Sequence, residues 1–379
     1  MVRKLMLSAV IAPAFLLAAS AQQAGGPYKV LQRAKVGGEG GTDYIFADVV
    51  GRKIYITRGA TRAVPATDST PERPAYVGRV SVFDIETLKP LGEIPNGGGN
   101  GAVVDPKSGH GFASSHPDVT MFDTKTMQLI KAIPAGDSGA SPRFSADGIY
   151  FDAFNDRVYV YSHPTHEAMV IDSHDGTMVG KIPLPGTPEQ SISDGKGTLY
   201  VVMQDSGSVA VVDQKAMKAI KSYPFGGNTG CNGLALDAKN QVLFAACART
   251  GPAPARGAPP VPSEPQMVIL SAKDGKIITK LPLAGSSDGA AFNPATMEAF
   301  SAHGNGTMTI VKEKSPTEFE VEQNLETMNL ARTLTLDTKT GHLFVMAAET
   351  APAPAAAAGG RGGRGATIPG SFTIVMIGK

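Results

Sequence analysis

Residues 197–227 read GTLYVVMQDSGSVAVVDQKAMKAIKSYPFGG. Short runs of alternating apolar residues are separated by turns rich in Gly, Asp and Ser, and no run has the 3.6-residue period of a helix. A second unit with the same order of runs and turns is found at 109–136, GHGFASSHPDVTMFDTKTMQLIKAIPAG. A unit of this size that recurs along a chain predicts a repeat architecture built from small antiparallel sheets.

Three features of this unit each occur seven times. The first strand of each unit ends in Asp or Asn, at Asp48, Asp105, Asp152, Asp194, Asp237, Asn293 and Asp337. The second carries an aromatic residue, at Tyr55, Phe112, Tyr159, Tyr200, Phe244, Phe300 and Phe344. The third ends at Asp84, Asp123, Asp172, Asp213, Ser271, Lys312 and Met376. These counts predict an all-β fold, a seven-bladed β-propeller of four-stranded antiparallel blades in a single domain over 22–379.

The last unit stops at Lys379, directly after its third strand. Residues 28–38, YKVLQRAKVGG, are similar to fourth strands such as 217–227, MKAIKSYPFGG. We therefore expect the N-terminal strand to complete the last blade, because this pairing removes two open sheet edges. A frayed N-terminal segment is the alternative.

The N-terminal 21 residues have the order of a secretory signal peptide. Arg3 and Lys4 precede an apolar run, Leu5 to Ala19, and Ala19-Ser20-Ala21 offers small residues for cleavage near Ala21. No later stretch has the roughly 20 apolar residues of a membrane helix, so no membrane span is expected after cleavage. The predicted location is periplasmic or secreted, and an uncleaved anchor is the alternative.

Charge and loop composition limit the partners. Lys and Arg number 35 against 34 Asp and Glu, which argues against nucleic acid as the partner of the whole molecule.

Insertions rich in Pro, Ala and Gly lie at 58–78, 248–265 and 348–369, always between a second and a third strand. Repetition places all three on the face that carries the channel mouth, where they are expected to be flexible or extended. The run GGRGGRG at 359–365 is interpreted as a solvated linker.

One polar residue lies five positions before each strand-ending Asp or Asn. These are Asp43, Asn100, Asp147, Glu189, Asn232, Asp288 and Arg332. The first strand of a blade lines the channel of a propeller, so we expect these seven residues to surround the channel mouth and to bind a ligand there. Their oxygen atoms suit Ca²⁺ or another divalent cation, and ordered water is the alternative.

A second polar group follows the second strands on the same face. It consists of His116, His163, Gln204 and His303, which we call the rim residues. Imidazoles bind transition metals and transfer protons near neutral pH. Their spacing matches no known metal motif, so surface histidines in turns are the alternative.

The two cysteines are predicted to form a disulfide. Cys231 opens the first strand of the fifth unit and Cys247 ends its second. A three-residue turn at Ala238 to Asn240 would place them opposite each other, and an exported protein meets oxidising conditions. A turn shorter by one residue would separate them.

The repeated units at 109–136 and 197–227 resemble those of the YVTN-type β-propeller repeat family, close to the YncE-like exported proteins of bacteria. The resemblance covers residues 28–379 and implies the propeller fold without specifying a reaction. The chain has no Trp, so the WD signature of related propellers is absent. Nucleophile-elbow, phosphate-loop and Rossmann motifs are also absent from the sequence.

We therefore expect an exported, non-enzymatic binding or scaffold protein, a monomer without a cofactor, which receives a small molecule or a protein at its channel-mouth face. The alternative is a lactonase-like, metal-dependent hydrolase. In that case Glu189, Asp288, Asn232 and Asp43 would hold a cation that polarises a carbonyl, and His116 or His163 would move the proton.

Overall fold

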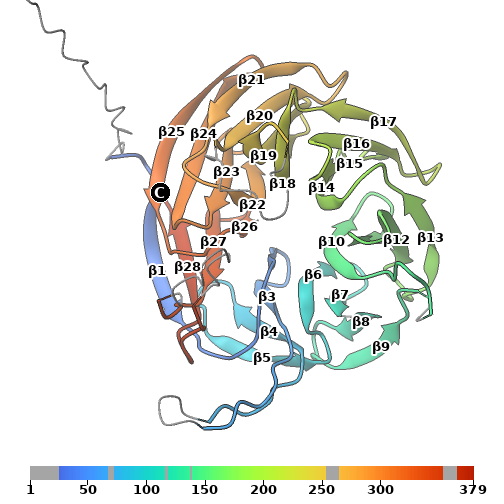
Figure 1. The fold of residues 1–379 in the computed structure, drawn as a ribbon, viewed down its shortest axis with the longest axis vertical. Helices are drawn as coiled ribbons and strands as arrows, with labels where there is room; N and C mark the ends of the chain where they lie inside the picture. The colour runs from blue at the N-terminus through green and yellow to red at the C-terminus, as the bar shows by residue number, and fades with distance from the viewer. Residues whose placement is uncertain (1–24, 67–71, 116–117, 137–138, 253–263, 353–364) are drawn as a thin grey trace, which may run out of the picture.

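The computed structural model describes residues 25–66, 72–115, 118–136, 139–252, 264–352 and 365–379. Seven four-stranded antiparallel sheets form a ring around a central axis (Figure 1), which confirms the predicted seven-bladed β-propeller. The space along this axis, between the innermost strands, is called the channel below. The predicted signal peptide, residues 1–21, lies outside the described residues. Within the described part of the chain, no helix is long and apolar enough to cross a membrane.

Each of the first six blades contains four consecutive strands, which follow one another from the channel outward. Blades 1 to 3 are β2 (Ile45–Asp48), β3 (Lys53–Arg58), β4 (Arg79–Asp84) and β5 (Pro90–Pro95); β6 (Gly99–Asp105), β7 (His110–Ser115), β8 (Asp118–Asp123) and β9 (Leu129–Ile133); and β10 (Ala146–Asp152), β11 (Arg157–Ser162), β12 (Glu167–Asp172) and β13 (Met178–Pro183). Blades 4 to 6 are β14 (Pro188–Ser193), β15 (Thr198–Met203), β16 (Ser208–Asp213) and β17 (Lys218–Pro224); β18 (Asn228–Asp237), β19 (Val242–Thr250), β20 (Gln266–Ser271) and β21 (Ile277–Pro282); and β22 (Ser287–Asn293), β23 (Glu298–His303), β24 (Thr307–Ser315) and β25 (Glu318–Glu326).

The seventh blade joins the two ends of the propeller. It consists of β26 (Leu334–Asp337), β27 (His342–Ala347), β28 (Thr373–Gly378) and, outermost, β1 (Lys29–Lys35), which pairs antiparallel with β28. The predicted closure by the N-terminal strand is therefore confirmed. Next to this seam, the Tyr28 hydroxyl donates to Glu298 of blade 6 over 2.5 Å, and Lys379 Nζ lies 2.9 Å from the same carboxylate.

Local hydrogen bonds explain why Asp or Asn recurs at the end of each innermost strand. In all seven blades its side-chain Oδ1 accepts a hydrogen bond from a backbone N–H of the following turn, as Gly51 donates to Asp48 over 2.7 Å and Lys107 to Asp105 over 2.8 Å. Such Asx turns compete with strand pairing and end it. The repeated residue is thus a strand terminator.

Apolar residues of neighbouring blades form the core. All seven second-strand aromatics are buried, with at most 6% of their surface exposed. Phe244 of blade 5, for example, stacks on Phe292 of blade 6 at a centroid distance of 5.3 Å. Most of β9 on the outer surface is exposed, as expected for an outermost strand. Because each blade packs on two neighbours, the ring holds the inner strands in fixed positions around the channel.

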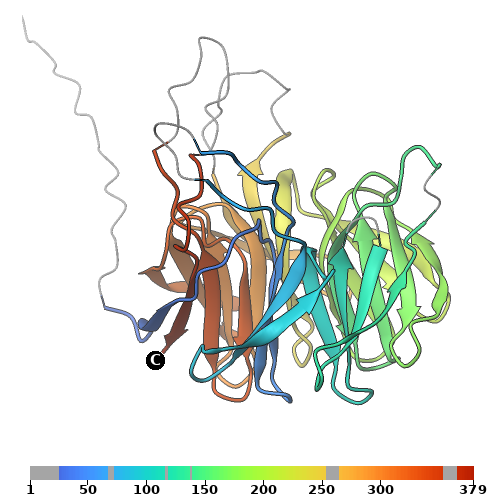
Figure 2. The ribbon, with the colours of Figure 1, turned by 90° about the horizontal axis from the view of Figure 1, so that it is seen from below.

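The three insertions lie where the repeat predicts them, between β3 and β4, β19 and β20, and β27 and β28. Figure 2 shows their described parts extending from one face of the ring. Two of them continue as extended hairpins, with isolated bridges between Thr61 and Tyr76 and between Thr350 and Thr367. At their base the Arg58 guanidinium lies 3.4 Å from the centre of the Phe372 ring, so the first and third insertions start from one packed unit.

Candidate functional site

β-Bulges position the predicted channel-mouth residues. In five blades the pairing of the innermost strand with its neighbour shifts at the mouth, and the shifts enclose Asn100, Asp147, Glu189, Asn232 and Asp288. A bulge adds a residue that the ladder leaves unpaired and turns its side chain in a new direction. Asp43 and Arg332 lie two residues before the first residues of the innermost strands of blades 1 and 7.

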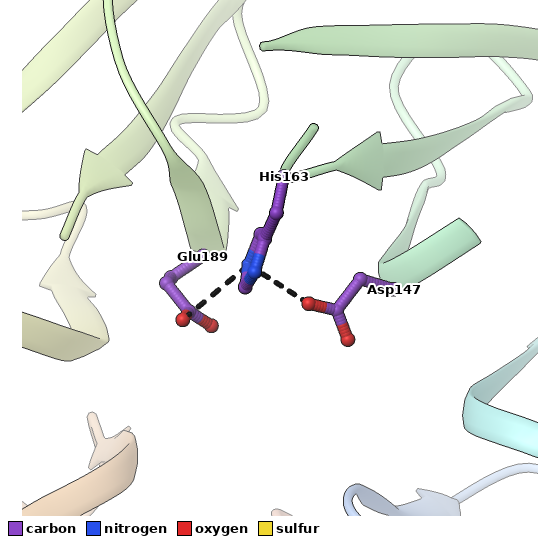
Figure 3. Close-up of side chains that lie close together, drawn as sticks. All are labelled: Asp147, His163 and Glu189. Carbon is purple, nitrogen blue, oxygen red and sulfur yellow. Dashed lines mark ion pairs between the residues drawn. The ribbon is translucent and has the colours of Figure 1, made fainter. Parts of the chain in front are cut away.

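These seven residues and two rim residues form one connected series, which we call the channel-mouth chain: Asp43, Asn100, Asp147, His163, Glu189, Gln204, Asn232, Asp288 and Arg332. On one side, Asn100 Nδ2 donates to Asp147 Oδ1. His163 Nε2 lies 2.8 Å from Asp147 Oδ2 and 3.4 Å from Glu189 Oε1 (Figure 3). Every blade contributes at least one member, so hydrogen bonds and ion pairs connect the seven predicted residues around the ring.

The other side of the series contains the guanidinium. Gln204 Nε2 donates to Glu189 Oε1 over 2.7 Å and lies 3.1 Å from Asn232 Oδ1. Asn232 Nδ2 in turn donates to Asp288 Oδ1 over 2.7 Å. Arg332 then forms ion pairs with two carboxylates. Its Nε lies 2.6 Å from Asp288, and its Nη2 lies 3.4 Å from Asp43 of blade 1.

The charges of the channel-mouth chain are therefore unevenly distributed. Arg332 lies between Asp43 and Asp288, at 3.4 and 2.6 Å, and partly neutralises both. Asp147 and Glu189 instead face His163, with 13% and 8% of their side-chain surfaces exposed. The sequence led us to expect a hard-cation site with oxygen ligands from Asp43, Asn232, Asp288 and Glu189. Arg332 already provides a positive charge beside two of these ligands, Asp43 and Asp288, so this set is less suited to a cation than the sequence suggested.

Tyr44 was missed by the sequence analysis. Its hydroxyl donates to Glu189 Oε2 over 3.0 Å, and its backbone N–H donates to the Asn100 carbonyl over 2.8 Å, which links blade 1 to blades 2 and 4. Burial raises the pKa of Tyr44 well above its usual value, so the hydroxyl keeps its proton. An aromatic residue directly after a channel-mouth residue was the available signal, but it occurs beside Asp43 and not at the equivalent positions of the other blades.

Burial and like charges shift the ionisation of this site. Burial raises the pKa of Asp43 to about 6, although the Arg332 guanidinium opposes the shift. Burial raises the pKa of Glu189 to about 7, against the opposing charge of His163. For His163, burial acts to lower the pKa, but the Asp147 carboxylate outweighs it and the pKa is raised. The surroundings thus disfavour the ionised forms of Asp43 and Glu189, and a bound cation would stabilise them.

The rim residues separate into different environments. His163 and Gln204 belong to the channel-mouth chain. His303 does not: it is fully buried and its Nε2 lies 2.9 Å from the Thr309 hydroxyl, so it lines no accessible rim. Burial lowers its pKa to about 3, which keeps the ring neutral. His116 lies outside the described residues.

The predicted disulfide between Cys231 and Cys247 is present. The predicted turn length was wrong: Ala238 to Gln241 connect Asp237 to Val242, which makes four residues rather than three. A bulge between Cys231 and Gly233 compensates for the extra residue and brings the cysteines opposite each other. The same bulge that directs Asn232 to the channel mouth therefore allows the disulfide to form.

Comparisons with known proteins agree with this architecture. No protein-family model matches the chain. The uncharacterised protein YncE of Salmonella typhimurium strain LT2 is 24% identical over 166 residues, which are 43% of this chain and 46% of YncE, and YncE of Salmonella typhi matches to the same extent. The matched stretch thus spans about half the length of these curated relatives.

Solved structures with the same fold are more distant in sequence. The WD40 domain of Neurospora crassa Pan2 superposes with a TM-score of 0.62 at 12% identity, covering 94% of this chain and 96% of that domain. A chain of Kuenenia stuttgartiensis hydrazine synthase gives 0.60 at 15% identity, covering 88% and 96%. At these identities the likeness concerns the fold alone. The chain is therefore a seven-bladed β-propeller protein that is similar to YncE over part of its length.

Proposed function

We propose that the chain is an exported, non-enzymatic binding protein that receives a cationic ligand at the mouth of its channel. The observation that carries this proposal is the composition of the channel-mouth chain, which contains four carboxylates but only one guanidinium and one imidazole. A narrow site with excess negative charge attracts cations, and the low dielectric of its walls strengthens that attraction.

Two further features support the proposal. The Cys231–Cys247 disulfide is typical of proteins that fold in oxidising compartments, which favours export. The three insertions extend from the channel-mouth face, where they would flank a bound ligand (Figure 2). Long loops in compact domains are frequently functional.

Thermal unfolding in the presence of cations tests the proposal. Ca²⁺, Mn²⁺, spermidine and choline are added separately to the purified chain, because a ligand present at about 100 times its Kd stabilises a protein by about 2.7 kcal/mol. We expect at least one of them to raise Tm. The double variant Asp147→Asn/Glu189→Gln should lose that shift.

The matched control is Asp156→Asn. Asp156 lies in the turn between β10 and β11, at the opposite end of the channel, where its carboxylate pairs with Lys107 over 2.9 Å. Asn also accepts the positive φ of 54° at this position. Absence of any Tm shift with the four cations, or an equal shift in wild type and double variant, would refute a cation-binding channel mouth.

A lactonase-like hydrolase is the alternative use of the same face. Hydrolysis of a simple lactone such as γ-butyrolactone, dependent on added divalent metal and lost in Glu189→Gln, would favour it over a binding protein.

A further inference from the structure

Asp147, His163 and Glu189 converge from two neighbouring blades. Asp147 lies in β10, His163 directly follows β11, and Glu189 lies in β14 (Figure 3). One nitrogen or oxygen atom from each side chain lies within 4.8 Å of the other two. We propose that these three side chains bind one divalent transition-metal ion such as Zn²⁺, Mn²⁺ or Co²⁺. This inference rests on the proposed cation-binding function of the same face.

The spacing of the three side chains suits such an ion. Zinc binds nitrogen and oxygen ligands at about 2.0–2.2 Å, so two ligands of a tetrahedral ion lie roughly 3.4 Å apart. His163 Nε2 is 2.8 Å from Asp147 Oδ2 and 3.4 Å from Glu189 Oε1. Small side-chain rotations would therefore admit a metal. The imidazole nitrogen favours a transition metal over Ca²⁺, which prefers oxygen ligands alone.

The orientation of the His163 ring supports a metal at this position. Its Nε2 is buried and lies between two carboxylates, in ion pairs with Asp147 over 2.8 Å and with Glu189 over 3.4 Å. The ring nitrogen is thus directed toward the space between the two carboxylates. A metal ion in that space would complete the coordination of all three groups.

Neighbouring side chains hold the two carboxylates in place. Asn100 donates to Asp147 Oδ1, which leaves Oδ2 facing the histidine. Tyr44 donates to Glu189 Oε2 over 3.0 Å, and Gln204 donates to Oε1 over 2.7 Å. Outer hydrogen bonds of this kind orient metal ligands, and their loss typically lowers metal affinity 10- to 100-fold.

The rest of the channel mouth makes this position specific. Arg332 pairs with Asp43 and Asp288, so its positive charge disfavours a second cation on that side. Three protein ligands also leave at least one coordination position for water or a bound molecule. The metal would thus form part of the surface that the channel mouth presents to its ligand.

Direct metal binding to the untagged, full-length chain tests this inference. Equilibrium dialysis against Zn²⁺ gives stoichiometry and affinity, and the visible absorption of Co²⁺ reports its coordination by nitrogen and oxygen. We expect one equivalent of metal and a loss of affinity of more than about tenfold in His163→Gln. The matched control is His174→Gln, because His174 is an exposed histidine whose Nε2 lies 3.7 Å from Asp156.

Asp147→Asn is the second variant and gives the same test if His163→Gln does not fold. Undiminished affinity in a folded ligand variant, or equal losses in His163→Gln and His174→Gln, would overturn the inference. Absence of Zn²⁺ and Co²⁺ binding would overturn it too. If spermidine, choline or Ca²⁺ still raises Tm in that case, the cation-binding function stands without a transition metal; if none does, both proposals fail.

Discussion

Replacing Glu313 by Gln should stabilise the protein above neutral pH. Glu313 is 2% exposed and accepts a hydrogen bond from Asn240 over 2.8 Å. Its other oxygen, and Oδ2 of the buried Asp237, have no hydrogen-bond partner among the described residues. Burial, with the adjacent negative charge of Asp237, raises the pKa of Glu313 to about 7. A proton on Glu313 relieves this repulsion, and the amide of Gln would provide a permanent N–H in its place.

The sign and size of the effect follow from proton linkage. Between about pH 4.5 and 7 the folded protein retains a proton that the unfolded chain has released, so the free energy of unfolding falls as the pH rises. A tenfold change in an acid constant corresponds to about 1.4 kcal/mol, which limits the wild-type penalty at pH 8 to about 3 kcal/mol. We expect Glu313→Gln to recover about 2 kcal/mol at pH 8 and almost nothing at pH 4.5.

Urea unfolding followed by far-UV circular dichroism measures this difference at both pH values. Glu318→Gln is the matched control, because Glu318 belongs to the next strand and its side chain is 67% exposed. It should change the stability little at either pH. A Glu313→Gln variant no more stable than wild type at pH 8, or with an equal gain at both pH values, would show that the ionised Glu313 carboxylate does not destabilise the fold.

Three other substitutions test the closure, the disulfide and the packing. Glu298→Gln removes the charge that pairs with Lys379 over 2.9 Å, so it should lower the free energy of unfolding by about 2 kcal/mol. It should also speed amide hydrogen exchange in β1, and unchanged exchange would contradict a role of Glu298 in closure. Reducing Cys231–Cys247, which are 16 residues apart, should lower stability by about 3 kcal/mol in urea titrations with and without reductant, whereas equal midpoints would argue against stabilisation by the bond. Gly98→Ala places a Cβ 2.2 Å from the Cα of Gly78, so Tm should fall, corresponding to about 1–3 kcal/mol; an unchanged Tm would mean that the two backbones separate readily.

His163 and His303 show how well the alignment of the repeats predicts which histidines face the channel. His163 is four residues after Tyr159, whereas His303 is three residues after Phe300. Because side chains alternate across a strand, this difference of one residue directs His163 to the channel and His303 into the core. The alternation was readable from the sequence, and applying it strictly would have removed His303 from the rim.

The cysteines show the opposite case, in which counting led to the right pair through a wrong turn length. The four-residue turn and the bulge at Asn232 each shift the register by one residue, and the two shifts cancel. Neither is marked by a distinctive residue in the sequence. Tyr44 was missed for a related reason, since its contact with Glu189 joins blades 1 and 4 across the channel.

Blade number, strand order and ring closure could be derived from the sequence because they depend on local chemistry: Asx turns end the innermost strands, aromatics mark the second strands, and alternation separates core from surface. The seven channel-mouth residues could also be identified from the sequence, because each lies five positions before a strand-ending Asp or Asn. Their partners depend on contacts across the channel, which the bulges and the curvature of the ring create. Arg332 therefore neutralises Asp43 and Asp288, while Asp147 and Glu189 are left facing His163.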